Sequence, residues 1–152
     1  MKKVRVTCKV LFVFLGASIV MIVIVVLVLG KYNTRIELLD IEVVTGIEME
    51  QISKNNSIGI AVINNQIDVA ALLTHLSSAR KASLTWYAAS NDNPTQPEYL
   101  AIRIAAGRSG QRLYLYTYGN REYVYNPYIG IYRIKNETSR EIYQIYASSV
   151  KQ

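Results

Sequence analysis

The chain has 152 residues, a formal net charge of +6 and a sequence pI near 9.4. Most of the positive excess lies at the N-terminus, because the residues from Lys31 onward carry 13 Lys and Arg against 11 Asp and Glu. A domain that binds nucleic acid concentrates its basic residues more strongly, so we expect no nucleic-acid partner. The single cysteine, Cys8, excludes a scaffold held together by disulfides.

Residues 10–29 form a run without any charge, VLFVFLGASIVMIVIVVLVL. At about 1.5 Å rise per residue, this run covers the roughly 30 Å hydrocarbon core of a bilayer as one helix. The basic residues of segment 1–9 favour a cytoplasmic N-terminus, which places residues 30–152 outside the cytoplasm. A cleaved signal peptide shares the basic start, but its apolar region is typically about 7–15 residues. We therefore expect a single-pass anchor in the lipid bilayer of the cell membrane, followed by one small domain.

After the anchor, Ile- and Val-rich runs between residues 35 and 63 are separated by turn residues at Thr45-Gly46 and at Lys54-Asn55-Asn56-Ser57. This spacing predicts two or three strands. The period then changes, because apolar side chains fall on one helical face: Ile67, Val69, Leu72, Leu73, Leu76 and Ala79. The pattern predicts an amphipathic helix of about four turns, with Asn65 as its N-cap and Arg80-Lys81 in its last turn.

A loop rich in turn formers, residues 90–97, precedes two hairpins whose register can be predicted. Gly119-Asn120 is typical of a two-residue hairpin loop, which places Tyr118 opposite Arg121, Tyr116 opposite Tyr123, Tyr114 opposite Tyr125 and Leu115 opposite Val124. A turn over residues 107–110 places Ile104 opposite Leu113, Ile102 opposite Leu115, Arg103 opposite Tyr114 and Tyr99 opposite Tyr118. A slip by one residue would mix tyrosines with aliphatic side chains on both faces, so the agreement supports this register.

The predicted meander has two different faces. The aliphatic face, which should pack against helices, carries Leu100, Ile102, Ile104, Leu113, Leu115 and Val124. The aromatic face carries Tyr99, Arg103, Tyr114, Tyr116, Tyr118, Tyr123 and Tyr125. Residues 130–134 should extend the sheet, and Thr138-Ser139-Arg140-Glu141 is a capping box for a last helix with Ile142, Ile145 and Tyr146 towards the core. The expected fold is α+β: an N-terminal transmembrane helix, then a small domain with an antiparallel β-meander and two helices on one face.

Several segments within residues 72–146 carry a resemblance to a known family. They are LTHLSSARK from Leu73, the Asn91-Asp92-Asn93-Pro94 turn, YLAIRI from Tyr99, LYLY from Leu113 and NPYIGIYRI from Asn126. This part of the chain resembles a family of uncharacterised extracytoplasmic domains from Firmicutes, in which a PY-x-G-IY pattern is typical. The resemblance implies a membrane-anchored or lipoprotein-like surface domain of a Gram-positive bacterium, and it brings no catalytic residue.

Residues suited to catalysis are few. His75 is the sole histidine and lies beside the apolar stripe of its helix, so we expect a half-buried boundary residue. Asp92 and Glu98 could form a carboxylate pair, but Asp92 lies among turn formers and is better explained by an Asx-type turn. The sequence contains no Walker-type loop and no G-x-S-x-G motif. We therefore expect no enzymatic activity, no metal site and no cofactor.

The aromatic face remains as the candidate site, although cross-strand tyrosine pairs also stabilise a sheet without a ligand, by up to about 1 kcal/mol each. Nine of the twelve tyrosines lie between residues 114 and 146, and no Phe follows the anchor. Hydroxylated rings favour a surface that stays in water and can stack and hydrogen-bond. The first hypothesis is a binding module for a protein, a peptide or a cell-wall component. The second is an accessory subunit of a membrane complex, in which Gly16-Ala17-Ser18 lets the transmembrane helix pack closely against a partner.

Overall fold

The structure is a computed structural model that describes residues 18–27, 35–82 and 91–150, and it divides into two units, Met1–Asn33 and Thr34–Gln152. In the first unit, residues 18–27 are helical and their side chains are exposed. Among the described residues, no helix is long and apolar enough to cross a membrane. The predicted anchor, residues 10–29, extends at both ends beyond the described helix, and the basic segment 1–9 lies outside the described residues.

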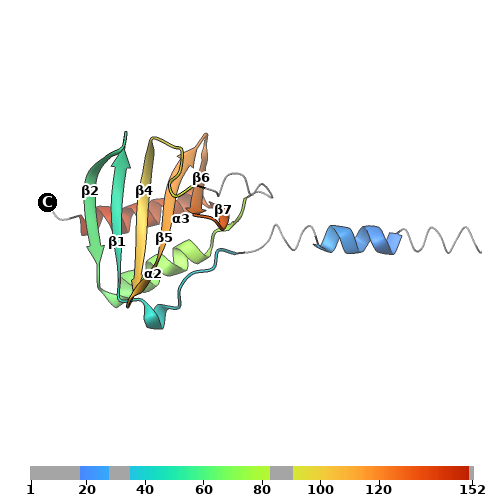
Figure 1. Cartoon of the computed structure of the whole chain (residues 1–152), viewed down its shortest axis with the longest axis horizontal. Coiled ribbons are helices and arrows are strands. Elements are labelled where there is room, and N and C mark those ends of the chain that lie inside the picture. The colour runs from blue at the N-terminus through green and yellow to red at the C-terminus, as the bar shows by residue number, and fades with distance from the viewer. Residues whose placement is uncertain (1–17, 28–34, 83–90, 151–152) are drawn as a thin grey trace, which may run out of the picture. The chain divides into compact units, whose positions relative to one another are not determined.

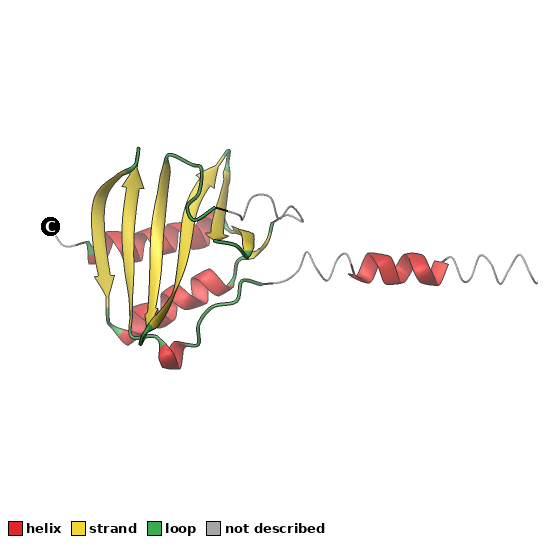
Figure 2. Ribbon diagram, viewed as in Figure 1, coloured by secondary structure: helices red, strands yellow, loops and turns green. Residues whose placement is uncertain are grey.

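The second unit is built on one antiparallel sheet (Figures 1 and 2). Its strands, in spatial order, are β2 (Asn56–Ile63), β1 (Gly46–Ser53), β4 (Glu98–Ala106), β5 (Ser109–Tyr118), β6 (Arg121–Asn126), β7 (Gly130–Ile134) and β3 (Arg80–Lys81). β4 to β7 form the predicted meander. The β1–β2 hairpin adds to one side of the meander, and the two-residue strand β3 adds to the other.

Two helices, α2 (Gln66–Ser77) and α3 (Asn136–Ser149), lie against one face of this sheet, and a short 3-10 helix, η1 (Ile41–Val43), precedes β1 (Figure 1). The main core lies between the helices and the sheet. All six residues of the predicted aliphatic face are fully buried there, together with Leu72 and Leu76 of α2 and Ile142 of α3. The prediction of an α+β domain with both helices on the aliphatic face is therefore confirmed.

The two predicted hairpin registers have different outcomes. Between β5 and β6 the register is as predicted, with Tyr116 opposite Tyr123 and Leu115 opposite Val124. Between β4 and β5 it was wrong by two residues, because Ile102 faces Leu113 and Leu100 faces Leu115. The cause is the turn: Gly107 takes a left-handed φ of +58°, so the loop has two residues where four were predicted. A shift of two keeps each side chain on its face, so alternation cannot detect it.

Three predictions about the helices need correction. Ile67 is 76% exposed because it lies about 200° around the helix from Val69, where the buried stripe begins. α2 ends at Ser77, so Arg80 and Lys81 belong to β3, although Asn65 caps the helix as predicted and its Oδ1 accepts from Ile67 N at 3.0 Å. The capping box at residues 138–141 is not used, because α3 already begins at Asn136.

Candidate binding surface

The predicted aromatic face is largely covered, which corrects the expectation of a surface in contact with water. Tyr114, Tyr116 and Tyr125 are buried in a second apolar cluster, and Tyr99 and Tyr123 pack against it half-buried. Tyr118 is 68% exposed at the end of β5. The rings pack on each other: those of Tyr116 and Tyr123 are stacked with centroids 5.7 Å apart, and the Tyr99 ring meets the Tyr114 ring edge-on at 5.5 Å.

The segment of residues 91–97 lies over this cluster and is held by tyrosine hydroxyls. The Tyr125 hydroxyl donates to the Asn91 carbonyl at 2.5 Å and accepts from Asn91 N–H at 3.2 Å. The Tyr114 hydroxyl donates to Asn93 Oδ1 at 2.7 Å, and the Tyr128 hydroxyl donates to Asp92 Oδ1. Three tyrosines therefore fix three consecutive residues of this segment. Two of the hydroxyl groups that suggested a wet surface, those of Tyr114 and Tyr125, serve instead to bind its cover.

Burial also changes the acidity of these tyrosines. It raises the pKa of the Tyr116 hydroxyl to about 12, with a smaller contribution from neighbouring Tyr123. Burial likewise raises the pKa of Tyr125 and of Tyr99. The hydrogen bond to the Asp92 carboxylate raises the pKa of exposed Tyr128. Because each of these pKa values is raised above 10, the hydroxyls are neutral at physiological pH, and none is poised to transfer a proton.

A cavity of about 380 Å³ remains between the segment of residues 91–97 and the sheet. Its walls are aromatic and are formed by Tyr116, Tyr118, Tyr123 and Tyr125. Its rim is polar and carries Asn91, Asn93, Thr95 and Gln96. An apolar floor with a few polar groups around it is the usual composition of a pocket for a small ligand group.

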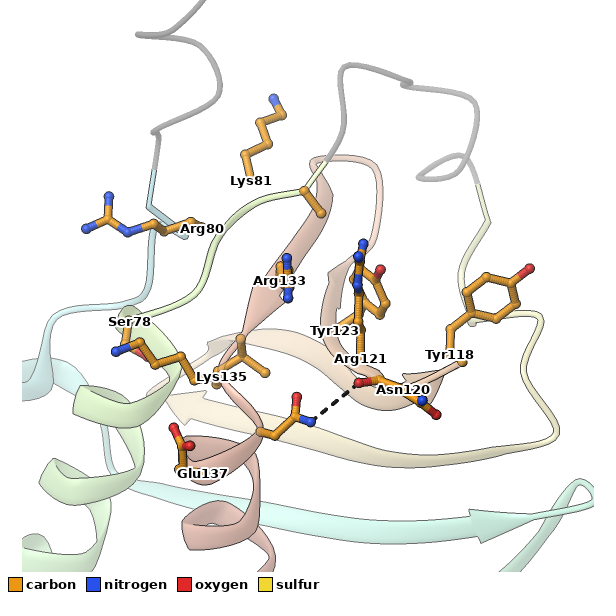
Figure 3. Close-up of a pocket in the computed structure, with 14 residues that line it drawn as sticks. Ser78, Arg80, Lys81, Tyr118, Asn120, Arg121, Tyr123, Arg133, Lys135 and Glu137 are labelled. Carbon is orange, nitrogen blue, oxygen red and sulfur yellow. Dashed lines mark hydrogen bonds between the residues drawn. The ribbon is translucent and has the colours of Figure 1, made fainter.

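A second hollow, a groove of about 910 Å³, lies beside the cavity at the β6–β7–β3 side of the sheet (Figure 3). Its lining is rich in cations: Arg80, Lys81, Arg121, Arg133 and Lys135. Tyr118 and Tyr123 belong to both hollows, so the aromatic cavity and the cationic groove adjoin. The pairing of β6 with β7 creates this arrangement, because it sets Tyr123 directly opposite Arg133.

The electrostatics of the groove are one-sided. Among its described lining residues, Glu137 supplies the one carboxylate. Within the described part of the chain, no Asp or Glu side chain forms an ion pair with Lys81, Arg121, Arg133 or Lys135. The first turn of α3 also borders the groove, and Lys135 at its N-cap position provides no side-chain cap. Uncapped N–H groups at a helix start carry partial positive charge, so the turn adds to the positive potential.

The structure brings together part of the predicted site and separates the rest. Tyr116, Tyr118, Tyr123 and Tyr125 line the cavity, whereas Tyr99 and Tyr114 lie outside the described lining of both hollows. Arg103 is also elsewhere, and its Nη1 pairs with Glu48 Oε1 at 2.8 Å. Sequence reasoning missed Arg133 and Lys81, since their positions depend on strand pairings between residues far apart. Arg121 could have been found from the sequence, because residues 121, 123 and 125 alternate along one strand and therefore lie on the same face of the sheet as Tyr123 and Tyr125.

The residues weighed for catalysis do not form a reactive group. His75 is a half-buried boundary residue as predicted, with 27% of its side chain exposed and its Nδ1 3.2 Å from Glu141 Oε2. Asp92 accepts from Tyr128, and Glu98 accepts from Ser53 Oγ at 3.3 Å, so the two carboxylates have separate partners. In the described segments, no group of His, Cys, Asp and Glu side chains could hold a metal ion.

Comparison with known proteins places the chain in a family. Residues 32–133 match the DUF5301 family, whose description is "Domain of unknown function (DUF5300)". The chain belongs to this family. No curated protein matches it. A solved structure, described as the NMR structure of the protein from Ruminococcus gnavus, is 24% identical, with a TM-score of 0.53 over 68% of this chain and 94% of that chain. This likeness supports the fold, and the family match supports the coarser part of the prediction, that the chain carries a domain of an uncharacterised family. The match ends at Arg133, so Lys135 and α3 lie beyond it.

Proposed function

We propose that this protein is a membrane-anchored extracytoplasmic binding module without enzymatic activity, whose ligand occupies the cavity under residues 91–97. The observation that carries the proposal is the pair of hollows that share Tyr118 and Tyr123. Of the face predicted from the sequence, the tyrosines that line these hollows are Tyr116, Tyr118, Tyr123 and Tyr125. The ligand class stays as broad as the residues allow: a protein segment, a peptide or a cell-wall component with a group that fits between tyrosine rings.

The chemistry of the cavity supports this role. Tyrosine rings offer a large rigid contact area at low entropic cost, and their hydroxyls can bond to a polar ligand. Because Tyr118 is mostly exposed, its ring is free to cover a ligand in the cavity. The buried Tyr114, Tyr116 and Tyr125 hold the floor and the cover in place. A site supported in this way is organised before the ligand binds, which lowers the entropy lost on binding.

The proposal of a membrane anchor rests on the composition of residues 10–29, and one structural observation supports it. The apolar side chains of residues 19–27 are each 47–64% exposed, all around the helix. A helix that is apolar on every side is unstable in water and suits a lipid environment.

Membrane topology can be tested with an impermeant maleimide on intact cells. Cys8 should resist labelling, because the basic flank favours a cytoplasmic N-terminus, whereas a cysteine introduced as Ser109→Cys at the exposed start of β5 should react readily. Labelling of Cys8 alone would reverse the proposed orientation.

Binding can be tested before the ligand is identified. The unit Thr34–Gln152 contains the whole described core, so it can be purified and applied to arrays of glycans, peptides and cell-wall fragments. Tyr118→Thr should weaken binding about tenfold, on the scale of an aromatic hot spot. Ile60→Thr is the matched control, because Ile60 is another exposed strand residue, on β2, outside the described lining of both hollows. Equal binding by the parent and Tyr118→Thr would contradict the proposal.

The second candidate is an accessory subunit of a membrane complex that contacts its partner through the transmembrane helix. The exposed apolar side chains of residues 19–27 favour it equally. Replacement of residues 10–29 by an unrelated transmembrane helix separates the two candidates. A binding module should keep its activity after the exchange, whereas an accessory subunit should lose it.

A further inference from the structure

The cavity and the groove together specify more about the ligand than either does alone. They share Ala82, Tyr118 and Tyr123, so a ligand group in the aromatic cavity has the cationic groove directly beside it. The groove volume of about 910 Å³ is larger than the 380 Å³ of the cavity. A ligand that fills the cavity therefore has room to continue into the groove.

The cations of the groove lack the compensation found elsewhere on the same sheet. Arg121, Arg133 and Lys135 are exposed and have no ion pair with a described carboxylate. By contrast, Arg103 near the middle of the sheet is paired with Glu48. Like charges held around one hollow repel each other, and a bound anion relieves that repulsion. The groove therefore favours a negatively charged ligand group, and Arg side chains can grip a carboxylate or a phosphate with two hydrogen bonds.

The rim of the cavity favours a polyhydroxylated ligand group. Asn91, Thr95 and Gln96 carry side chains that can donate and accept hydrogen bonds, as sugar hydroxyls do. Within the described residues, these three side chains have no hydrogen-bond partner of their own, so they are available to a ligand. Tyrosine rings beneath them offer flat apolar walls to the C–H faces of a sugar ring. One sugar ring needs a single apolar ring face, which the largely exposed Tyr118 can supply. Single-stranded nucleic acid instead needs several successive free ring faces for its bases, and the Tyr116 and Tyr123 rings stack on each other.

From these observations we infer that the ligand is an anionic glycan. A neutral sugar ring lies in the aromatic cavity, and the charged group next to it, a uronate carboxylate or a phosphodiester, lies in the groove against Arg121, Arg133 and Lys135. The inference rests on the proposed binding function and names its ligand class.

The experiment measures binding of the Thr34–Gln152 unit to defined probes by calorimetry. One probe is an oligosaccharide that alternates a neutral sugar with a uronic acid, and its carboxyl-reduced form is the uncharged counterpart. Another is a glycosylated poly(glycerol phosphate) oligomer, which separates phosphodiester from carboxylate as the source of charge. A single-stranded oligodeoxynucleotide and anionic phospholipid vesicles test the other polyanions. At least one charged glycan should bind, its uncharged counterpart should bind about tenfold or more weakly, and affinity should fall as salt is raised.

Two charge variants identify the groove as the cause. The triple variant Arg121→Gln, Arg133→Gln, Lys135→Gln removes exposed cations of the groove. The control triple variant Arg108→Gln, Arg112→Gln, Arg140→Gln removes the same formal charge at exposed positions outside the described lining. The groove variant should bind the charged glycan about tenfold more weakly than the control, on the basis of a few exposed ion pairs.

Each remaining outcome decides the question. Equal losses in the two triple variants, or equal binding of charged and uncharged glycan, would overturn the anionic-glycan inference and leave the binding function intact if Tyr118→Thr still weakens binding. Tighter binding of the oligodeoxynucleotide or of the vesicles than of either charged glycan would also overturn the inference. Loss of charged-glycan binding in the groove variant with no effect of Tyr118→Thr would overturn the proposed use of the aromatic cavity.

Discussion

The two faces of the sheet are covered in different ways. On the aliphatic face, α2 and α3 bury a continuous set of Leu, Ile and Val side chains. On the aromatic face, the residues 91–97 cover a cluster of tyrosines and leave a cavity and a groove beside them. Aliphatic packing needs a large apolar surface opposite it, which a helix supplies. A short polar segment can cover tyrosines because their hydroxyls hydrogen-bond to it, and the incomplete cover leaves room for a ligand.

The largest effect should come from a charge placed in the aliphatic core. Val124 is fully buried towards the helices, so Val124→Asp introduces an unpaired carboxylate there. This costs several kcal/mol of a total stability of about 5–15 kcal/mol, and the domain should unfold. Arg121→Ser, three residues away on the exposed side, should change the free energy of unfolding by about 0.5 kcal/mol or less. Urea denaturation followed by circular dichroism measures both, and equal effects would mean that the faces are exchanged.

The aromatic cluster should contribute less than the core but more than a wet surface would. Replacing Tyr116 and Tyr123 together by Thr keeps the strand propensity and removes a stacked pair of rings. Tyr116 is only 5% exposed. We expect a loss of about 3 kcal/mol, because the change leaves a void beneath residues 91–97. Tyr118→Thr, at the exposed end of the same face, should lose about 0.5 kcal/mol or less. A loss below about 1 kcal/mol for the double variant would show that the cluster is open to water.

Alkaline pH should weaken both faces through tyrosines whose pKa is raised by burial. Burial raises the pKa of Tyr116 on the aromatic face and of Tyr143 on α3 to about 12 each. In the folded state the pKa of each hydroxyl lies above the ordinary value of 10, which applies to the unfolded chain. The contribution of each neutral hydroxyl to the free energy of unfolding is therefore complete below pH 10 and is lost between pH 10 and about pH 12. The slope should reach up to about 1.4 kcal/mol per pH unit for each group. Urea midpoints across this range measure the slope, and Tyr116→Phe and Tyr143→Phe should each reduce it.

The smallest of these effects concerns the hydroxyls that hold the cover. Tyr125→Phe keeps the ring but removes the hydrogen bonds to the Asn91 carbonyl and N–H. The expected loss is about 1 kcal/mol, because Asn91 is exposed and water can replace the hydroxyl. Backbone amide exchange of residues 91–97 should accelerate while that of β5 and β6 changes little. Unchanged exchange in residues 91–97 would show that the hydroxyls do not hold the segment.

The amino-acid sequence by itself determined which residues share a face. Alternation of period two separates Leu115 and Val124 from Tyr116 and Tyr123, and the Gly119-Asn120 loop fixes their register because two residues permit one pairing. The helix N-cap at Asn65 and the strand at residues 130–134 were equally local signals. Local signals suffice where residues close together in the sequence determine the geometry.

Tertiary structure decided what covers each face and where the charges meet. The β4–β5 register depends on the backbone angle at Gly107, and α3 begins before its capping box. Burial of Tyr116 depends on a segment about 20 residues away in the chain, and the groove forms because strand pairing places Arg80 opposite Arg133 and Arg133 opposite Tyr123. Such contacts join residues with no fixed spacing in the sequence. The local sequence therefore determines which residues share a face of the sheet, whereas the segments that fold onto that face determine its exposure to water.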